Sequence, residues 1–375
     1  MLRSKTILGI MFCTVLLCLF SIPISKSSKD SLVQDYETMI DPDQFPGLTN
    51  FEKLQNALNS VPPTGAIVLV PSKVYEGSNL TVPSKVRIVG ANGTVFRLCD
   101  SAIGAFMPID DRNDVVIENI VFDGNMERQT DADVSMVFID HGCDNVLITN
   151  NTFRNFRYQA IASDFSMLSG CTRFITVCRN LFVDGEGAAI LLRGGYADGE
   201  YFLENIEIYD NILCNLTFNG KIGVAFASNC SITGNQIVSC EATCSGSIAI
   251  RGCKNVYVSK NSISKCAARA GIFIEANMLF PNKGTFLIEN NRISGQVGEG
   301  FSLSGFRGVE AEITLRKNFF TQNYGFDIET TNVTIYVYAN IVDTLEDLEL
   351  SATTVAWGNQ ARFGTGYTFI QSRAR

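Results

Sequence analysis

The sequence predicts an all-β fold, a single-stranded parallel β-helix with three strands per coil and about nine to ten coils. Two observations predict it. The pattern apolar-x-apolar-x-x-Asn-x-apolar occurs eight times between residues 146 and 342, and a further short apolar segment follows seven of these copies after a loop of variable length. Apolar residues two apart indicate strands with one buried face, and repetition indicates stacked coils.

Composition narrows the function before any motif is considered. Hydrophobic residues make up 46% of the 375 residues and charged residues 18%, which is enough apolar material for a large core. The net charge of -8 argues against a nucleic-acid partner, since phosphate binding needs clustered positive charge. His141 is the single histidine, which excludes a multi-histidine metal site. Chemistry must therefore rest mainly on carboxylates, Arg, Lys or Tyr.

The first 27 residues read as a signal peptide or an N-terminal anchor. Arg3 and Lys5 precede an apolar run over residues 7–24, which is the charge-then-apolar order of an export signal. The following Ser25-Lys26-Ser27 is a poor cleavage site, and the run is long enough to cross a bilayer, so an uncleaved anchor stays open. We expect a secreted or extracellular-surface protein, with membrane contact only through this segment.

A short helix should close the first coil. Residues 51–58 are amphipathic, and Thr49 with Glu52 three residues later forms a capping box. Such a helix protects a strand edge that would otherwise template aggregation. We therefore assign residues 28–65 to an N-terminal cap, residues 66–345 to the β-helix and residues 346–375 to a C-terminal cap.

The repeated asparagine marks a tight bend, where its side-chain amide can bond the asparagine of the next coil. Spacings between copies range from 22 to 31 residues, which the variable loops explain. The predicted ladder consists of Asn151, Asn180, Asn211, Asn235, Asn261, Asn291, Asn318 and Asn340.

Ten of the twelve cysteines lie beyond the N-terminal segment. Cys240 and Cys266 each lie five residues after a ladder asparagine, so they should stack on adjacent coils. A disulfide and a reduced stack of small apolar groups both fit that placement. Cys230 falls in an inward strand position and is expected in the core. Sequons that would make the protein a glycoprotein in a glycosylating host occur at Asn79, Asn92, Asn150, Asn215, Asn229 and Asn332.

With these repeats and the preceding helix, roughly residues 50–345 resemble the pectate-lyase-like family of right-handed parallel β-helices, whose repeats share a Val-x-Ile-x-x-Asn-x-Phe pattern. The resemblance implies a right-handed coil and a substrate groove along the third strand of each coil. No enzyme signature carries over. Polygalacturonases have Asn-Thr-Asp, Asp-Asp, Gly-His-Gly and Arg-Ile-Lys motifs, whereas here His141-Gly142 follows Asp140, Asp110-Asp111 lies too early, and Arg-Ile-Lys is absent. The Asp-Pro-His-Glu motif of mannuronan epimerases is also absent.

Charged residues gather at the ends of the third strands, and they are the candidate site. Two carboxyl groups on neighbouring coils can divide acid and base roles, and Arg can neutralise a sugar carboxylate. The alternative is that Asp164–Arg193 and Arg251–Glu275 are ion pairs on a solvated face, and that His141 is a spectator. The candidate catalytic residues are Asp140, His141, Asp164 and Arg193, and the candidate substrate-binding residues are Arg251, Phe273 and Glu275.

Two functions follow from this site. The first is an exported lyase, hydrolase or epimerase of acidic polysaccharides, which would need no certain cofactor, although aspartates could hold Ca²⁺. The second is a non-catalytic β-helical surface protein that binds glycans or serves a structural role. Both predict a polysaccharide or glycan partner. The sequence specifies neither the sugar nor the oligomeric state.

Overall fold

The computed structural model describes residues 36–130, 134–163, 170–275, 282–295, 298–304, 310–321, 323, 326–329, 334–342, 354–363 and 366–372. The chain divides into two compact units, Met1–Asp35 and Tyr36–Arg375, and all described residues belong to the second. The predicted export signal therefore lies outside the described residues. Within them, no helix combines the length and the apolar character that a membrane crossing requires.

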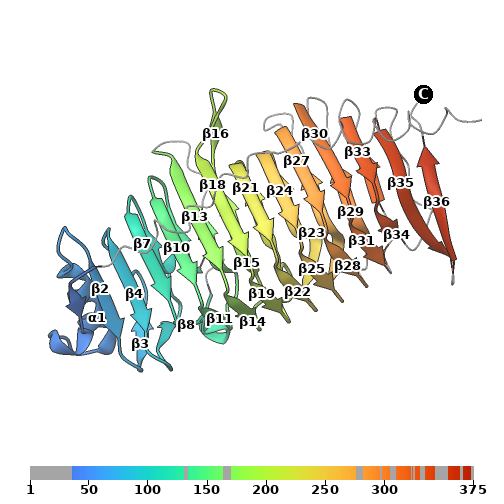
Figure 1. The fold of residues 1–375 in the computed structure, drawn as a ribbon. Helices are drawn as coiled ribbons and strands as arrows, with labels where there is room; N and C mark the ends of the chain where they lie inside the picture. Colours follow the sequence, from blue (N-terminus) through green and yellow to red (C-terminus); the bar gives the residue numbers. More distant parts are fainter. Residues whose placement is uncertain are drawn as a thin grey trace, which may run out of the picture. The chain divides into compact units, whose positions relative to one another are not determined.

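The N-terminal part of the second unit contains the predicted helix. Helix α1 (Asn50–Asn59) begins at Thr49, whose hydroxyl accepts a bond from the Glu52 backbone amide, while Glu52 accepts one from the amide of Thr49. Leu54, Ala57 and Leu58 form its buried face. Short elements that the sequence did not indicate precede it, namely β1 (Met39–Ile40) and the 3-10 helix η1 (Pro42–Gln44). The capping helix is thus present, at the start of the stack of coils (Figure 1).

Most coils contribute one strand to each of three parallel ladders, in which a strand pairs with its copies in the neighbouring coils. The first ladder, which continues from β1, contains β2 (Ala66–Val70), β4 (Val86–Gly90), β7 (Asn113–Glu118), β10 (Asp144–Thr149), β13 (Thr172–Cys178), β18 (Leu203–Tyr209), β21 (Ser228–Thr233), β24 (Lys254–Ser259), β27 (Lys283–Glu289), β30 (Glu310–Arg316) and β33 (Thr334–Tyr338). The second contains β3 (Val74–Gly77), β5 (Val95–Leu98), β8 (Val121–Asp123), β11 (Thr152–Arg154), β14 (Leu181–Val183), β19 (Ile212–Cys214), β22 (Gln236–Val238), β25 (Ser262–Ser264), β28 (Arg292–Ser294), β31 (Phe319–Thr321) and β34 (Ile341–Val342).

The third ladder is a separate sheet of nine strands in the described part of the chain, and it is called here the third-strand sheet. With eleven strands in each of the first two ladders and nine in this sheet, the described residues form about ten coils, in agreement with the nine to ten predicted. The strands of this sheet are β6 (Ala105–Ile109), β9 (Ser135–Ile139), β12 (Gln159–Ser163), β15 (Ala188–Arg193), β20 (Ile222–Ala225), β23 (Glu241–Arg251), β26 (Ala267–Glu275), β29 (Glu299–Ser304) and β32 (Phe326–Glu329).

Two elements depart from this plan. The short 3-10 helix η2 (Met126–Arg128) follows β8, and an antiparallel hairpin of β16 (Tyr196–Ala197) and β17 (Glu200–Tyr201) rises between β15 and β18. In Figure 1 the hairpin projects beyond the neighbouring coils at the top of the view.

The asparagine ladder between the first two strand ladders is confirmed. Asn180 shows the repeating unit: its Nδ2 donates to Asn211 Oδ1 at 3.1 Å and to the carbonyl of Ile148 at 2.9 Å. Its backbone amide also donates to Asn211 Oδ1, at 3.0 Å. The residue before each ladder asparagine has a positive φ, between 53° and 67°, which forms the bend. Where Ile120 replaces the asparagine, its amide donates to Asn151 Oδ1, so the ladder begins there.

Stacked side chains fill the interior. The rings of Phe122, Phe153 and Phe182 lie parallel in successive coils, with centroids 4.7 and 5.0 Å apart. Cys240 and Cys266 are both free thiols and both buried, which favours the reduced alternative for this pair. Cys230 is buried, as predicted. The interior is thus a column of in-register apolar layers.

The chain ends in two further strands. β35 (Thr354–Phe363) pairs in parallel with both β33 and β34, so this one long strand continues the first two ladders. β36 (Gly366–Ser372) then pairs antiparallel with β35.

Candidate functional site

The candidate site lies where strands of the third-strand sheet end. Ile109 and Ile139 are register partners at the ends of β6 and β9, so the residues that follow them, Asp110 and Asp140, occupy the same place in neighbouring coils. Backbone bonds extend the pairing beyond the strands, because the amide of Asp140 donates to Ile109 O at 2.7 Å and that of Asp111 to His141 O at 3.0 Å. The repeat itself therefore brings two carboxylates together.

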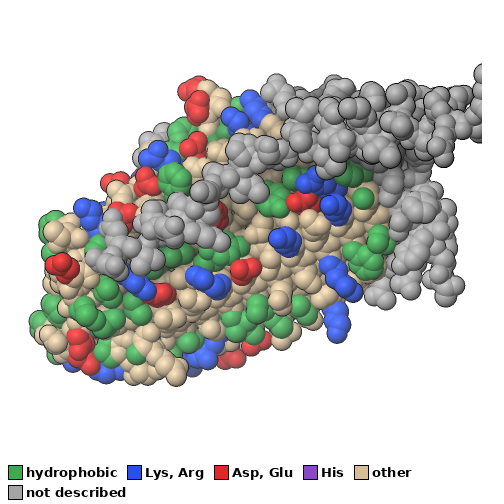
Figure 2. Space-filling view, viewed as in Figure 1, with side chains coloured by type: hydrophobic (Ala, Val, Ile, Leu, Met, Phe, Trp, Pro, Cys, Tyr) green, Lys and Arg blue, Asp and Glu red, His purple; other side chains and the backbone are tan. Residues whose placement is uncertain are grey.

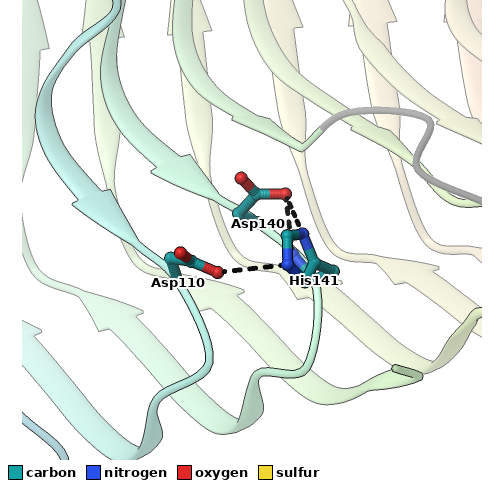
Figure 3. Close-up of side chains that lie close together, drawn as sticks. All are labelled: Asp110, Asp140 and His141. Atoms are coloured by element: carbon teal, nitrogen blue, oxygen red, sulfur yellow. Dashed lines mark hydrogen bonds and ion pairs between the residues drawn. The ribbon is translucent and has the colours of Figure 1, made fainter. Parts of the chain in front are cut away.

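His141 lies between these two carboxylates (Figure 3). Its Nδ1 atom is 2.8 Å from Asp140 Oδ1, and its Nε2 atom is 3.5 Å from Asp110 Oδ1. The same Asp140 oxygen accepts the backbone amide of His141 at 2.8 Å. The side chains of Asp140 and His141 are each 33% exposed and that of Asp110 is 57% exposed, so a ligand in solvent can reach all three.

Local contacts hold this turn in place. Thr172 Oγ1 donates to the carbonyl of Asp140 at 3.0 Å from the next coil. Gly142 has φ +72°, and a Cβ there would lie 3.0 Å from Asp111 Oδ1. The His141-Gly142 dipeptide therefore reflects a backbone requirement of the turn.

Arg193 joins Asp140 and His141 around a small pocket of about 20 Å³. Ser163 connects the walls, because its hydroxyl donates to Arg193 O at 3.0 Å and accepts the Arg193 amide at 2.8 Å. A volume of this size holds about one water molecule. The remaining lining residues are Ile139, Gly170, Thr172, Gly194, Gly195, Phe202 and Leu203.

Cys143 lies beneath the turn as a buried thiol, and its Sγ donates to Ile109 O at 3.2 Å. Burial, assisted by the charges of Asp110 and Asp140, raises the pKa of Cys143 to about 11. A thiol with such a pKa stays protonated near neutral pH, so Cys143 is no nucleophile.

Three of the other predicted site residues, Arg251, Phe273 and Glu275, do not line this pocket. Arg251 and Glu275 form an ion pair across adjacent coils, with Arg251 Nε 2.9 Å from Glu275 Oε2, as the alternative reading predicts. Phe273 is buried, at 4% exposure, and the Arg269 guanidinium lies 4.9 Å from its ring centroid. Its ring is therefore not presented to a sugar. Asp164 lies outside the described residues.

In the group of Asp110, Asp140 and His141, Asp110 is the member that the sequence analysis did not name as a candidate. Asp110-Asp111 lies earlier in the chain than the Asp-Asp of the polygalacturonase motif, so that motif does not point to it. The repeat of the chain itself indicates Asp110. Asp110 follows Met107-x-Ile109 as Asp140 follows Val137-x-Ile139 one coil, or thirty residues, later.

The group of Asp110, Asp140 and His141 offers two carboxylate oxygens and one ring nitrogen within 4.8 Å of one another. Ca²⁺ takes about six to eight oxygen ligands. These side chains provide two, so the set fits Ca²⁺ poorly. The arrangement is better suited to proton transfer, since an imidazole and two carboxylates are in or near hydrogen-bond reach of one another.

Comparison with known proteins agrees with the fold. A family model described as "Right handed beta helix region" matches residues 167–342. No curated protein sequence matches the chain. Among solved structures, a hyperthermoactive exopolygalacturonase from Thermotoga maritima has a TM-score of 0.58 and 12% identity, over 90% of this chain and 95% of that one. A polygalacturonase from Erwinia carotovora ssp. carotovora has a TM-score of 0.50 and 12% identity, over 81% and 98%.

The enzymatically active domain of tailspike protein 2 from bacteriophage CBA120 is also similar, with a TM-score of 0.56 and 11% identity. The alignment covers 82% of this chain and 48% of that one, so this chain spans about half the length of that domain. At such low identity these likenesses show the fold alone. The resemblance to right-handed parallel β-helix proteins is thereby confirmed.

Proposed function

We propose that this right-handed parallel β-helix protein is an exported polysaccharide hydrolase whose acid–base group is Asp110, Asp140 and His141. The observation that carries the proposal is the placement of two carboxylates and one imidazole within 4.8 Å, at an accessible edge of the third-strand sheet. The similar folds of the two polygalacturonases support the substrate class.

Hydrolysis of a glycosidic bond needs a proton for the departing oxygen and a base for the attacking water. Asp140 and His141 border the pocket that is large enough for one water, so we assign the base to this pair. Asp110, the most exposed of the three, is assigned as the proton donor. His141 contacts both carboxylates and can return the proton between them after each cycle.

A lyase or epimerase of acidic sugars is a second candidate, and the position of Arg193 favours it. Arg193 belongs to the lining of the pocket that Asp140 and His141 share. It could neutralise a sugar carboxylate while His141 removes the adjacent proton. Under hydrolysis the same guanidinium would bind a sugar hydroxyl.

Non-catalytic glycan binding is the remaining candidate. It is favoured by the Arg251–Glu275 ion pair, because these two charged residues at the ends of third strands bind each other across adjacent coils. A non-catalytic protein would bind glycans without releasing product.

The test is turnover of a polysaccharide panel, scored for new reducing ends. Asp140→Asn should lower kcat at least about a hundredfold, since it removes the base. Asp144→Asn is the matched control, because Asp144 lies in the same coil, is 34% exposed and is paired with Arg173. Equal activity of Asp140→Asn and wild type would contradict the proposal. Binding without product by the wild type would favour the non-catalytic candidate.

Export belongs to the same proposal and rests on Arg3, Lys5 and the apolar run over residues 7–24. A chain that lacks residues 1–27 should remain inside the producing cell, whereas the full chain should appear outside it or on its surface. N-terminal sequencing of the exported form distinguishes a cleaved signal from a retained anchor. Equal export of both forms would contradict the assignment.

A further inference from the structure

The β16–β17 hairpin is built onto the wall of the candidate site. Gly194 and Gly195 enter the hairpin, Phe202 and Leu203 leave it, and all four line the pocket with Asp140, His141 and Arg193. The amide of Phe202 donates to Gly195 O at 2.9 Å and closes the base of the hairpin. The amide of Gly194 donates to Ala225 O at 2.8 Å, which ties the base to the next coil.

The stem of the hairpin is also held from a distance. The rings of Tyr196 and Tyr201 lie 4.8 Å apart, and Tyr201 is buried at 5% exposure. The Nζ atom of Lys283 donates to Tyr196 OH at 3.0 Å, from β27, three coils beyond β18. The hairpin thus has a fixed direction, which a specificity element requires.

The tip of the hairpin is acidic. Asp198 and Gly199, with φ of 53° and 89°, make the two-residue turn, and Asp198, Gly199 and Glu200 are all exposed. In Figure 2 the projection at the place of β16 carries acidic side chains, in red, at its tip.

Negative charge exceeds positive charge around the site in the described residues. The acids are the exposed Asp110 and Asp111, the half-buried Asp140 and the two tip residues, five carboxylates in all. Among the cations, Arg173 and Arg251 are ion-paired with Asp144 and Glu275. Arg112, Arg193 and Lys283 also carry positive charge, since a hydrogen bond to a neutral group such as Tyr196 OH does not cancel it. The two nitrogens of Arg112 with described bonds donate to the carbonyls of Val82 and Asp111. Such a field repels a polyanion and attracts a cation.

We propose that the site selects polysaccharides bearing free amino groups, such as partly de-N-acetylated hexosamine polymers, and that Asp198 and Glu200 are its specificity residues. This inference rests on the proposed function and names its substrate class. An ammonium group on a sugar beside the bond to be cleaved would lie in the field of the tip acids, with the pyranose ring held at the pocket wall. A uronate at the same position would be repelled by the carboxylates of the tip.

The test compares binding of three oligosaccharides of equal length: a glucosamine oligomer, its N-acetylated form and a galacturonate oligomer. Calorimetry measures affinity and product analysis measures hydrolysis in the same samples. The variant is Asp198→Asn/Glu200→Gln, in which Asn tolerates the positive φ. The matched control is Asp184→Asn/Glu186→Gln, which removes the same charges at exposed positions before β15, at the opposite end of that strand.

We expect the wild type to bind the glucosamine oligomer most tightly. The tip variant should lose about three- to tenfold in affinity for it, while its affinity for the N-acetylated oligomer stays unchanged. The difference should shrink at high salt, and the control variant should match wild type.

Preference for the galacturonate oligomer, absence of glucosamine binding, or an unchanged affinity in the tip variant would each overturn the inference. Hydrolysis without preference for the amino form would leave the proposed function standing and remove this inference. Tip-dependent binding of the amino form without product would support this inference and contradict the proposed hydrolysis.

Discussion

His141 Nδ1 lies 2.8 Å from Asp140 Oδ1, while Nε2 on the other side of the ring lies 3.5 Å from Asp110 Oδ1. The shorter contact orients the ring, because the hydrogen bond of one nitrogen sets the tautomer and the role of the other. Nε2 is thereby directed at the carboxylate of the preceding coil. Asp140 and His141 lie on one coil, and the stacking of coils adds Asp110 from the preceding coil as the third member of the group.

Asp110→Asn should lower kcat at least about tenfold with little change in KM, because it removes the assigned proton donor and keeps the shape of the side chain. Steady-state kinetics on the best substrate of the panel measures it. Asp111→Asn serves as control, since Asp111 is the exposed neighbour and Asn tolerates its φ of 50°. If both variants keep wild-type kcat, Asp110 is a spectator.

Asn211→Ala should lower the free energy of unfolding by about 3 kcal/mol or more. Asn211 is fully buried; its Nδ2 donates to Asn235 Oδ1 and Val177 O, and its Oδ1 accepts two bonds from Asn180. The change leaves these groups unpaired. Urea unfolding followed by circular dichroism measures the loss.

The control for this change is Asn205→Gly, which removes the acceptor of one exposed bond from Asn229 and suits the positive φ of 57° at that position. It should cost less than about 1 kcal/mol. A similar loss of unfolding free energy in both variants would contradict a larger contribution of the buried ladder to stability.

Stability should decline as the pH rises from about 9 to 11. The folded protein raises the pKa of Cys143 from 9.0 to about 11, so it binds the thiol proton more tightly than the unfolded chain does. This contribution, up to about 3 kcal/mol, is complete below the unfolded pKa and is lost as the pH passes the folded pKa. Urea unfolding at a series of pH values should show a smaller alkaline decline for Cys143→Ala. An identical decline would contradict the assignment.

The Arg251–Glu275 pair should contribute little to either stability or turnover. The Arg251 side chain is 52% exposed, and exposed pairs typically give less than about 1 kcal/mol. A double-mutant cycle with Arg251→Met and Glu275→Gln, followed by urea unfolding, measures the coupling. A kcat loss in Arg251→Met comparable to that of Asp140→Asn would instead return Arg251 to the catalytic site.

Much of the fold could be predicted because the coil repeats its chemistry. The ladder asparagines and the inward apolar positions recur at every coil, so each copy supports the assignment of the others. The same regularity could have revealed Asp110, since its place relative to Ile109 repeats that of Asp140 relative to Ile139. The Asp-Asp motif of polygalacturonases does not indicate Asp110, because it occurs at a different place in the repeat.

The rest depended on features that occur once. The hairpin around Asp198-Gly199 interrupts a single coil, although its Asp-Gly turn is a hairpin signal. Phe273 belongs to an outward position yet is buried, and strand alternation alone does not report what covers a side chain. The engagement of Arg251 by Glu275 likewise depends on the register between coils, which sequence spacing gives only approximately.

Product analysis in oxygen-18-labelled water tests the central claim most directly. Hydrolysis at Asp110, Asp140 and His141 breaks the glycosidic bond with a water molecule. Mass spectrometry should therefore find one labelled oxygen at each new reducing end and none at the new non-reducing end, which keeps the glycosidic oxygen. The Asp140→Asn protein should form this labelled product at least about a hundredfold more slowly. Unlabelled, unsaturated products that absorb in the ultraviolet would contradict hydrolysis and identify a lyase.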